Sequence, residues 1–251
     1  MTPLVLSGKP RPYIMAHRGN NVACPENTLA AFRRALADGA DILETDLHLT
    51  RDGVFVCIHD ETVDRTTNGR GAVAEMTLAE IKQLSASYGR PEFAAERVPT
   101  LSEVAALVPT DVMLALELKT DRFLEPEVCR RLVAELDATG MRNRAAALSF
   151  TFSRAQAVRA VAPDILIGPI TMTNPFPFAE AQLFGPFWPL LLLNPFYTLI
   201  AHLRRALVCP LDPTPDSRLW LYRLLGCDAV LTDDPAATIK ALGRGGASRP
   251  N

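Results

Sequence analysis

The sequence has no pair of cysteines at metal-binding or redox spacing, and its 251 residues include only five cysteines. These five are scattered and odd in number, which argues against a disulfide framework and against a cysteine zinc site. Residues 1–12 contain neither a long apolar run nor a small-residue cleavage pattern, so we expect no secretory signal. Together these absences predict a protein of the reducing cytoplasm.

The sequence also lacks an excess of charge of either sign. Lys and Arg number 26 against 28 Asp and Glu, which gives a formal net charge of −2. A sequence pI near 6.1 provides no general attraction to nucleic acid, and we expect no nucleic-acid partner. Hydrophobic residues make up 48% and charged residues 22% of the chain, which excludes a disordered protein, a fibre or a coiled coil.

One stretch lacks charge altogether. No formal charge lies between Glu180 and Arg204, and residues 183–200 are strongly apolar. This length approaches the ~20 residues of a transmembrane helix, but three prolines within it would each remove a helical hydrogen bond. We therefore favour a buried strand flanked by loops over a membrane span. A loop in peripheral contact with a membrane through residues 183–200 stays open.

Short apolar segments alternate with helical patterns, which is typical of an α/β fold with parallel strands. Eight segments have the composition of strands: Tyr13–His17, Asp41–Leu49, Val112–Lys119, Ala145–Phe150, Asp164–Ile170, Pro189–Asn194, Ala206–Leu211 and Ala229–Asp233. Eight strands in about 250 residues is the size of a (β/α)₈ TIM barrel, whose sites lie at the carboxyl ends of the strands. The competing doubly wound sheet requires a glycine-rich phosphate turn after an early strand, which the sequence lacks.

Helical patterns separate these strands, at Thr28–Asp38, Ser102–Val108, Glu127–Thr139, Ser153–Val161, Thr198–Arg205, Arg218–Leu225 and Pro235–Leu242. The first has apolar residues at helical spacing, with Asn27 as the expected N-cap. Residues 60–99 break the alternation with turn residues and a capping box at Thr77-x-x-Glu80. We therefore expect a single barrel domain over residues 1–251, with a small insertion at about 60–99 after the second-strand hairpin, on the active-site side.

Polar side chains occupy the ends of the first three predicted strands, which are otherwise apolar. They are His17 and Arg18 after the first strand, Glu44 and Asp46 in the second, and Glu117 and Lys119 in the third. Residues two apart in a strand share one face, so each of the latter pairs points the same way. Asp52-Gly53 then signals a two-residue hairpin turn. In the register that such a turn sets, His59 lies opposite Asp46 and joins the carboxylate face.

Three carboxylates at one barrel mouth repel one another unless their charge is compensated. One could take up a proton, but a bound divalent cation is the more economical answer, because hard oxygen ligands suit Mg²⁺ or Ca²⁺. The surrounding cations make a site for a phosphate, which Arg18 would clamp bidentately and Lys119 would contact as a point charge. His17 and His59 would act as a general base and acid pair on opposite sides of phosphorus. We expect the remaining polar candidates, His48, His202 and Ser149, to be structural.

A series of short motifs runs along the chain in order. They are His17-Arg18-Gly19, Pro25-Glu26-Asn27-Thr28, Glu44-Thr45-Asp46, Thr50-x-Asp52-Gly53, His59-Asp60, Arg65-Thr66-Thr67, Gly69-x-Gly71, Glu117-x-Lys119, Ser149-Phe150 and Thr232-Asp233-x-Pro235. Together they resemble the glycerophosphodiester phosphodiesterase family. The resemblance covers nearly the whole chain, is most specific over residues 17–71 and weakens over residues 170–215.

The resemblance implies a metal-dependent phosphodiesterase that cleaves glycerophosphodiesters, such as deacylated phospholipids, into sn-glycerol 3-phosphate and an alcohol. Positions that match Glu44, Asp46 and Glu117 are metal ligands in the family, and positions that match His17 and His59 transfer protons. The implied cofactor is one divalent cation, Mg²⁺ or Ca²⁺. The implied partner is a small-molecule glycerophosphodiester or lysolipid.

One departure from the family lies at the end of the seventh predicted strand. Many relatives carry a Trp-x-x-Asn motif there, and this chain has Cys209-Pro210-Leu211-Asp212. The apolar residues 176–197 would either compensate for the missing aromatic or widen the pocket, and a wider, more apolar pocket favours lysophospholipids. Two alternatives stay open: a lysophospholipase D or sphingomyelinase D-like enzyme that releases a cyclic phosphate, and an inactive membrane-associated binding protein.

Overall fold

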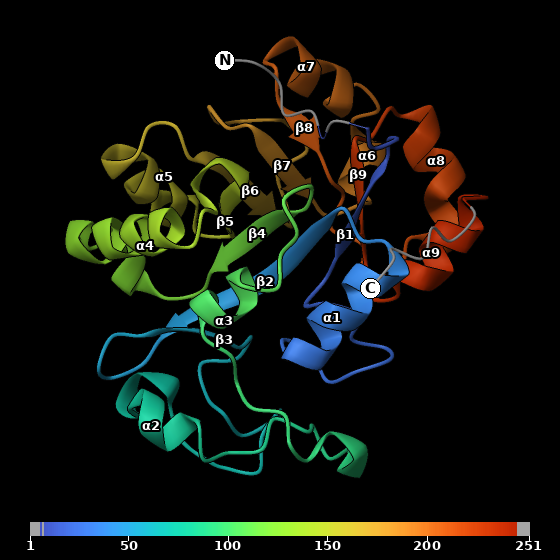
Figure 1. Cartoon of the computed structure of the whole chain (residues 1–251). Helices are drawn as coiled ribbons and strands as arrows, with labels where there is room; N and C mark the ends of the chain where they lie inside the picture. The colour runs from blue at the N-terminus through green and yellow to red at the C-terminus, as the bar shows by residue number, and fades with distance from the viewer. Residues whose placement is uncertain (1–5, 7, 245–251) are drawn as a thin grey trace.

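The computed structural model describes residue 6 and residues 8–244. Over these residues the chain forms a nearly closed barrel of parallel strands with helices between them, which confirms the predicted TIM barrel (Figure 1). The parallel strands are β1 (Tyr13–Ala16), β2 (Ile42–Leu49), β4 (Met113–Leu118), β5 (Ala145–Ser149), β6 (Leu166–Thr171), β7 (Leu183–Pro186), β8 (Leu207–Val208) and β9 (Ala229–Thr232). Residues 1–5, 7 and 245–251 lie outside the described part of the chain, and with them part of the segment in which we expected no secretory signal.

Helices connect most of these strands, although the described residues form none between β6 and β7. They are α1 (Leu29–Asp38), α2 (Leu78–Ile81), α3 (Leu101–Ala105), α4 (Pro126–Ala138), α5 (Phe152–Val161), α6 (Leu190–Leu193), α7 (Tyr197–Leu203), α8 (Leu219–Leu224) and α9 (Pro235–Ala241). The strands follow the order β8-β7-β6-β5-β4-β2-β1-β9, so the first strand pairs with both the second and the last. Where β8 meets β9, the N–H of Asp228 donates to the carbonyl oxygen of Val208 at 2.9 Å. Because these strands are parallel, their carboxyl ends meet at one mouth.

Every second residue of a strand points into the barrel. Along β2 and β4 these inward residues are first apolar and then, nearer the carboxyl ends, charged. Ile42 of β2 and Ala115 of β4 belong to a buried apolar cluster built almost entirely from strand residues. The next residues in the same alternation are Glu44 and Glu117. Side chains two apart point to the same face, so these carboxylates also point into the barrel. The intervening strand residues face outward and pack beneath α1, α3, α4 and α5 in a second, larger cluster.

The sixth predicted strand, Pro189–Asn194, is wrong. The strand lies earlier, as β7 (Leu183–Pro186), and residues 190–193 form α6. Pairing explains the difference, because Gly185 is the partner of Ile170 in β6 and the strand then ends at a proline, which has no N–H to extend the ladder. Four consecutive leucines are compatible with a buried strand or with a helix by periodicity alone.

The uncharged residues 183–200 are thus divided among β7, α6 and the start of α7. In the part of the chain that the structure describes, no helix is both long and apolar enough to cross a bilayer. The stretch does contain a buried strand, but at Leu183–Pro186 instead of Pro189–Asn194, and helices rather than loops follow it. The helices after it expose apolar side chains, with Leu193 at 74% and Phe196 at 64% of their full exposure.

The predicted hairpin forms between β2 and the antiparallel strand β3 (Phe55–Cys57), but its register differs by one residue. The residue opposite Asp46 is Ile58, whose N–H donates to the Asp46 carbonyl oxygen at 3.0 Å, and not His59. The loop has three central residues instead of two. The last of them, Gly53, has φ of +80°, which is the left-handed conformation that closes three-residue hairpin loops.

Two local predictions near the barrel mouth have different outcomes. The N-cap of α1 is Thr28, whose hydroxyl accepts from the N–H of Ala31, and not Asn27. Asn27 has φ of +54°, whereas an N-cap residue takes an extended conformation. The capping box at Thr77-x-x-Glu80 is confirmed and opens α2, which lies within residues 60–99 at the bottom of Figure 1.

Gly19, in the turn between β1 and α1, generates a prediction about stability. Its φ is +82°, and a Cβ there would lie 2.6 Å from the backbone carbonyl carbon of Ala31. We expect Gly19→Ala to lower the free energy of unfolding by about 2–4 kcal/mol, since left-handed strain and overpacking add. Gly140→Ala is the matched control, because Gly140 has φ of +68° with no atom within 4 Å of its Cβ position. Urea denaturation measures both, and equal losses would contradict the packing argument.

Candidate active site

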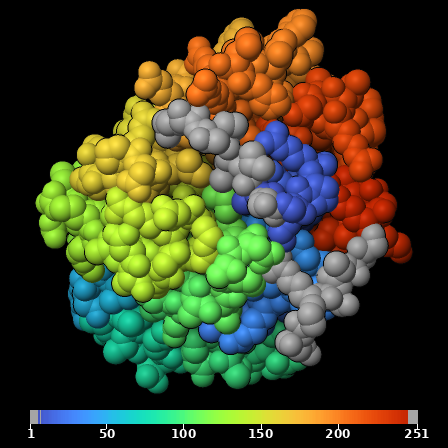
Figure 2. All heavy atoms as spheres, turned by 45° about the horizontal axis from the view of Figure 1, so that its top comes forward, coloured from blue at the N-terminus to red at the C-terminus, as the bar shows by residue number. Residues whose placement is uncertain are grey.

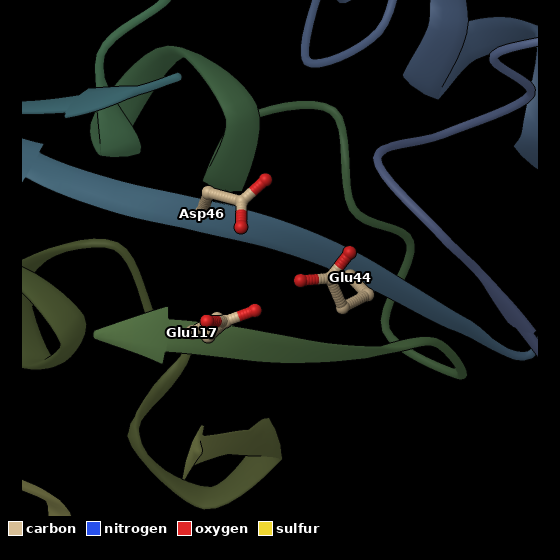
Figure 3. A group of neighbouring side chains, drawn as sticks. All are labelled: Glu44, Asp46 and Glu117. Atoms are coloured by element: carbon tan, nitrogen blue, oxygen red, sulfur yellow. The ribbon is translucent and has the colours of Figure 1, made fainter. Parts of the chain in front are cut away.

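Three carboxylates meet inside the barrel near its mouth (Figure 3). Glu44 and Asp46 come from β2 and Glu117 comes from β4. Asp46 and Glu117 are register partners on adjacent strands, and Glu44 lies two residues earlier on the same face. One oxygen from each lies within 4.8 Å of the others, and all three residues are buried. The structure thus brings together the three carboxylates that the sequence analysis grouped.

Burial and neighbouring charges shift the pKa values of the three carboxyls in different directions. Burial, together with the neighbouring charges of Asp46 and Glu117, holds the pKa of Glu44 well above its ordinary value. Burial and the charge of Asp46 also raise the pKa of Glu117. Burial opposes ionisation of Asp46 as well, but Arg18 and Lys119 outweigh it and lower the pKa of Asp46. A buried acidic cluster of this kind favours either a shared proton or a cation.

Two cationic side chains contact the cluster, Arg18 after β1 and Lys119 after β4, the two parallel strands beside β2. The guanidinium Nε of Arg18 lies 3.2 Å from Asp46 Oδ2. The ammonium of Lys119 donates to Glu117 Oε1 at 2.8 Å and lies 3.5 Å from Asp46 Oδ1. Asp46 Oδ1 is nevertheless buried without a hydrogen-bond partner among the described residues. Apart from this ion pair with Lys119, Asp46 Oδ1 therefore has capacity for a further ligand.

Arg18 and Asn27 both have unusual backbone conformations and both donate hydrogen bonds to the acidic cluster. Their φ angles are +58° and +54°, in the left-handed region that costs a non-glycine residue free energy. The backbone N–H of Arg18 donates to Glu44 Oε2 at 3.0 Å. The Asn27 side chain donates to Asp46 Oδ2 at 2.9 Å and accepts from the Thr45 hydroxyl at 2.7 Å. The strain is therefore offset by contacts that fix the acidic cluster.

His17 follows β1 and is oriented by the end of β9. Its Nδ1 lies 2.7 Å from Asp233 Oδ1. The same carboxylate oxygen accepts from the Asn21 side chain at 2.6 Å, and Asn21 also donates to the His17 carbonyl oxygen at 2.9 Å. With Nδ1 bonded to a carboxylate, Nε2 is the ring nitrogen that remains for other contacts.

His59 has the same arrangement on the other side of the cluster. Its Nδ1 lies 2.7 Å from Asp60 Oδ1. Arg65 donates to both Asp60 oxygens and to both Glu26 oxygens, and Glu26 in turn accepts from Arg18 at 3.1 Å. An unbroken chain of ion pairs therefore joins the carboxylate behind His59 to the arginine beside the acidic cluster.

The seven predicted site residues occupy one region of the barrel mouth. His17 lines a cavity together with Glu44 and Glu117, and His59 lies within electrostatic range of Asp46 and Glu117. The three residues expected to be structural bond elsewhere: His48 to the His59 carbonyl oxygen, Ser149 to that of Leu118, and His202 to Asp228. The sequence did not predict the residues that orient the site side chains through hydrogen bonds and ion pairs. They are Asn21, Glu26, Asn27, Asp60, Arg65 and Asp233. Five of these six lie within the motifs that carry the family resemblance, which is the signal that could have found them.

Comparison with known proteins identifies the family. Residues 17–177 match the model of the glycerophosphoryl diester phosphodiesterase family. A glycerophosphodiester phosphodiesterase of Caldanaerobacter subterraneus is 37% identical over 243 residues, which are 93% of this chain and 98% of the relative. The putative glycerophosphodiester phosphodiesterase YhdW of Bacillus subtilis is 40% identical over 166 residues, which are 64% of this chain and 67% of the relative.

Solved structures agree with this result. A phosphodiesterase of Oleispira antarctica, in complex with the product sn-glycerol-3-phosphate, superposes with a TM-score of 0.84 at 28% identity and covers 92% of this chain and 97% of its own. A glycerophosphodiester phosphodiesterase of Agrobacterium tumefaciens superposes with a TM-score of 0.78 at 26% identity and covers 91% of this chain and 99% of its own.

The raised pKa of Glu44 predicts a pH-dependent stability of the metal-free protein. A carboxyl whose folded-state pKa exceeds its unfolded-state value contributes its stability below the unfolded-state pKa and loses it as the pH rises through the folded-state pKa. Glu44→Gln keeps an acceptor for the Arg18 N–H and never ionises. We therefore expect Glu44→Gln to stabilise the protein relative to wild type more at about pH 8 than at about pH 5. Thermal midpoints in EDTA measure this, and a parallel pH dependence of the two proteins would contradict it.

Proposed function

The chain belongs to the glycerophosphoryl diester phosphodiesterase family, and from that premise we propose that it hydrolyses glycerophosphodiesters to sn-glycerol 3-phosphate and an alcohol with one divalent cation and two histidines. Its enzyme class, glycerophosphodiester phosphodiesterase, follows from the family. The cation and the roles of individual residues are the proposal. The observation that carries it is the buried acidic cluster flanked by two imidazoles, each bonded through Nδ1 to a carboxylate.

The cluster fits a divalent cation. Its three ligands are carboxylates, which hard cations such as Mg²⁺ or Ca²⁺ prefer, and Asp46 Oδ1 is buried without a donor. Glu44, Asp46 and Glu117 would hold the ion. When bound, it would supply Lewis-acid polarisation of the phosphoryl group.

The chain's own residues would supply the remaining chemistry. Arg18 and Lys119 lie on the cluster and would bind phosphoryl oxygens, stabilising the charge that accumulates there. One imidazole, His17 or His59, would accept the proton of the attacking hydroxyl as the new P–O bond forms. The other would donate a proton to the departing alcohol oxygen as its P–O bond breaks. The attacking group is a water or the glycerol 2-hydroxyl, and in the second case water then opens the cyclic phosphate with the two roles reversed.

We also propose that the protein contacts a membrane from the cytoplasm. The cysteines of the described chain are all free and buried, which suits a reducing compartment. Leu193, Phe196 and Leu199 are each more than half exposed. Leu193 ends α6, Phe196 lies between the two helices, and Leu199 lies in α7, which belongs to the orange atoms at the top of Figure 2. The exposed Arg204 follows α7 directly, and apolar side chains next to a cationic one suit an anionic lipid interface.

Removal of either imidazole tests the proposed catalysis. We expect His17→Ala and His59→Ala each to lower kcat on glycerophosphocholine by ~10²–10⁴, because proton transfer loses its donor or acceptor. Mn²⁺ binding, measured by calorimetry, should be nearly unchanged, because neither side chain belongs to the acidic cluster. Asp233→Asn is the graded control. It should lower kcat by a smaller factor than His17→Ala does, since the imidazole of His17 remains. Wild-type turnover in both alanine variants would refute the assignment.

Vesicle flotation tests the membrane contact. We expect Leu193→Asp with Phe196→Asp to weaken binding to phosphatidylglycerol-containing vesicles by at least about tenfold, because two exposed apolar side chains that would enter the lipid interface are replaced by negative charges. Leu124→Asp is the matched control, since Leu124 is also exposed but lies between β4 and α4. Unchanged flotation of the double variant, or equal loss in the control, would overturn this part of the proposal.

A further inference from the structure

Arg65, which follows β3 in the chain, has its whole guanidinium group engaged in hydrogen bonds. Its Nε donates to Asp60 Oδ2 at 2.7 Å, and its Nη2 donates to Asp60 Oδ1 at 3.0 Å. On the adjoining edge, Nη2 and Nη1 donate to Glu26 Oε1 and Oε2, each at 2.8 Å. Nη1 also donates to the Tyr88 hydroxyl at 3.4 Å. A guanidinium has five N–H donors, and these contacts account for all of them.

The two carboxylates that Arg65 joins each contact a residue with a proposed role in the reaction. Asp60 Oδ1 lies 2.7 Å from Nδ1 of His59, the imidazole proposed for proton transfer. Glu26 Oε1 accepts from Nη1 of Arg18 at 3.1 Å, and Arg18 is proposed to bind phosphoryl oxygens. Both of these carboxylate oxygens also accept from the same atom, Nη2 of Arg65. One nitrogen atom therefore lies between the contacts that orient His59 and Arg18.

Strand pairing does not fix the separation between these two side chains directly. Arg18 follows β1, and His59 lies just beyond β3. Among the described strands, β1 pairs with β2 and β9, whereas β3 pairs only with β2. The nitrogens of a guanidinium lie in one plane at fixed separations. Arg65 thus provides a rigid connection where the sheet provides none.

The surroundings of Arg65 favour a geometric role over a stabilising one. Its side chain keeps 35% of its full exposure, and ion pairs at exposed sites add little to stability. Two adjoining bidentate contacts, by contrast, fix both carboxylates relative to one plane. The Tyr88 ring lies over the guanidinium, with its centroid 5.4 Å from Cζ, and the Tyr88 N–H donates to the Thr66 carbonyl oxygen at 3.1 Å. Tyr88 thereby limits the movement of Arg65 towards solvent.

We propose that Arg65 is a positioning residue for the reaction, whose guanidinium sets the imidazole of His59 and the guanidinium of Arg18 in their productive arrangement. It would act through Asp60 and Glu26 without contacting the substrate. The inference rests on the proposed function, because it requires proton transfer by His59 and phosphoryl binding by Arg18. Misplacement of a reacting group by about 1 Å can lower turnover by about 10²-fold, so a residue at this distance can control the rate.

Two single substitutions separate the two contacts of Arg65. Asp60→Asn should lower kcat on glycerophosphocholine by about 10–100-fold, because His59 loses its orienting carboxylate. The inhibition constant of sn-glycerol 3-phosphate, which reports phosphoryl binding, should stay nearly unchanged in this variant. Glu26→Ala releases Arg18 and should raise that inhibition constant by about tenfold or more. Arg65→Ala should show both effects.

Arg65→Lys keeps the positive charge but loses the planar fork. An ammonium has three donors on one nitrogen and cannot bond two carboxylates bidentately. We therefore expect Arg65→Lys to lower kcat/KM to within about threefold of the Arg65→Ala value. Because it retains the charge between the two carboxylates, Arg65→Lys also keeps the test decisive if Arg65→Ala fails to fold.

Free guanidinium ion provides a readout that a general loss of stability would not produce. In Arg65→Ala the ion can occupy the space between Asp60 and Glu26, whereas ammonium carries the same charge without the fork. We expect guanidinium chloride at about 50 mM to raise kcat/KM of Arg65→Ala by at least about fivefold, and ammonium chloride at the same concentration to leave it unchanged. Equal effects of the two salts would overturn the proposal.

Arg51→Ala is the matched control. Arg51 is also an exposed arginine paired with a carboxylate, Glu80, but it lies outside this chain of ion pairs, so kcat/KM and the inhibition constant should keep their wild-type values. Wild-type kcat/KM in both Arg65 variants would overturn the inference and leave the proposed function standing. If the wild-type protein does not hydrolyse glycerophosphodiesters, the proposed function fails and the inference fails with it.

Discussion

Three carboxylates lie buried together inside the barrel, and their mutual repulsion has to be offset by the surrounding residues. Two unit charges at about 4–5 Å repel by about 3–4 kcal/mol at an effective dielectric constant near 20. Glu44 and Glu117 respond with raised pKa values, and Arg18 and Lys119 approach from two strands. The left-handed backbone at Arg18 brings its N–H to Glu44. These features together stabilise the cluster, and among the described residues Asp46 Oδ1 accepts no hydrogen bond. Buried carboxylate oxygens of this kind are the ligands that hard cations prefer.

The orientation of each imidazole is set by a further carboxylate outside the acidic cluster. Asp233 and Asp60 hold the Nδ1 atoms of the two histidines, and each is itself held, by Asn21 and by Arg65 respectively. Such partners fix the orientation of the ring and the nitrogen that faces the substrate. Because Arg65 also bonds Glu26, which accepts from Arg18, the insertion after the hairpin is connected to the acidic cluster. It therefore contributes directly to the geometry of the site.

The parts of the fold that follow from strand alternation were predictable from the sequence. Charged residues two apart in apolar strands, such as Glu44 and Asp46, can only share a face, and parallel strands bring their ends together. The errors arose where several structures satisfy the same local pattern. A strand and a helix both accommodate the leucines of 190–193, and Asp52-Gly53 also closes a three-residue loop, which moved the register by one. Tertiary contacts decided these cases, since β7 pairs with β6 and β8 before the leucines begin.

The central claim is that a divalent cation occupies the acidic cluster, and its position can be measured directly. In crystals grown with Mn²⁺, an anomalous difference map should show its strongest peak at about 2.0–2.6 Å from carboxylate oxygens of Glu44, Asp46 and Glu117. Asp46 Oδ1, the oxygen without a donor, should be among its ligands. A map with no peak between these three side chains, and with the ion bound elsewhere, would contradict the account.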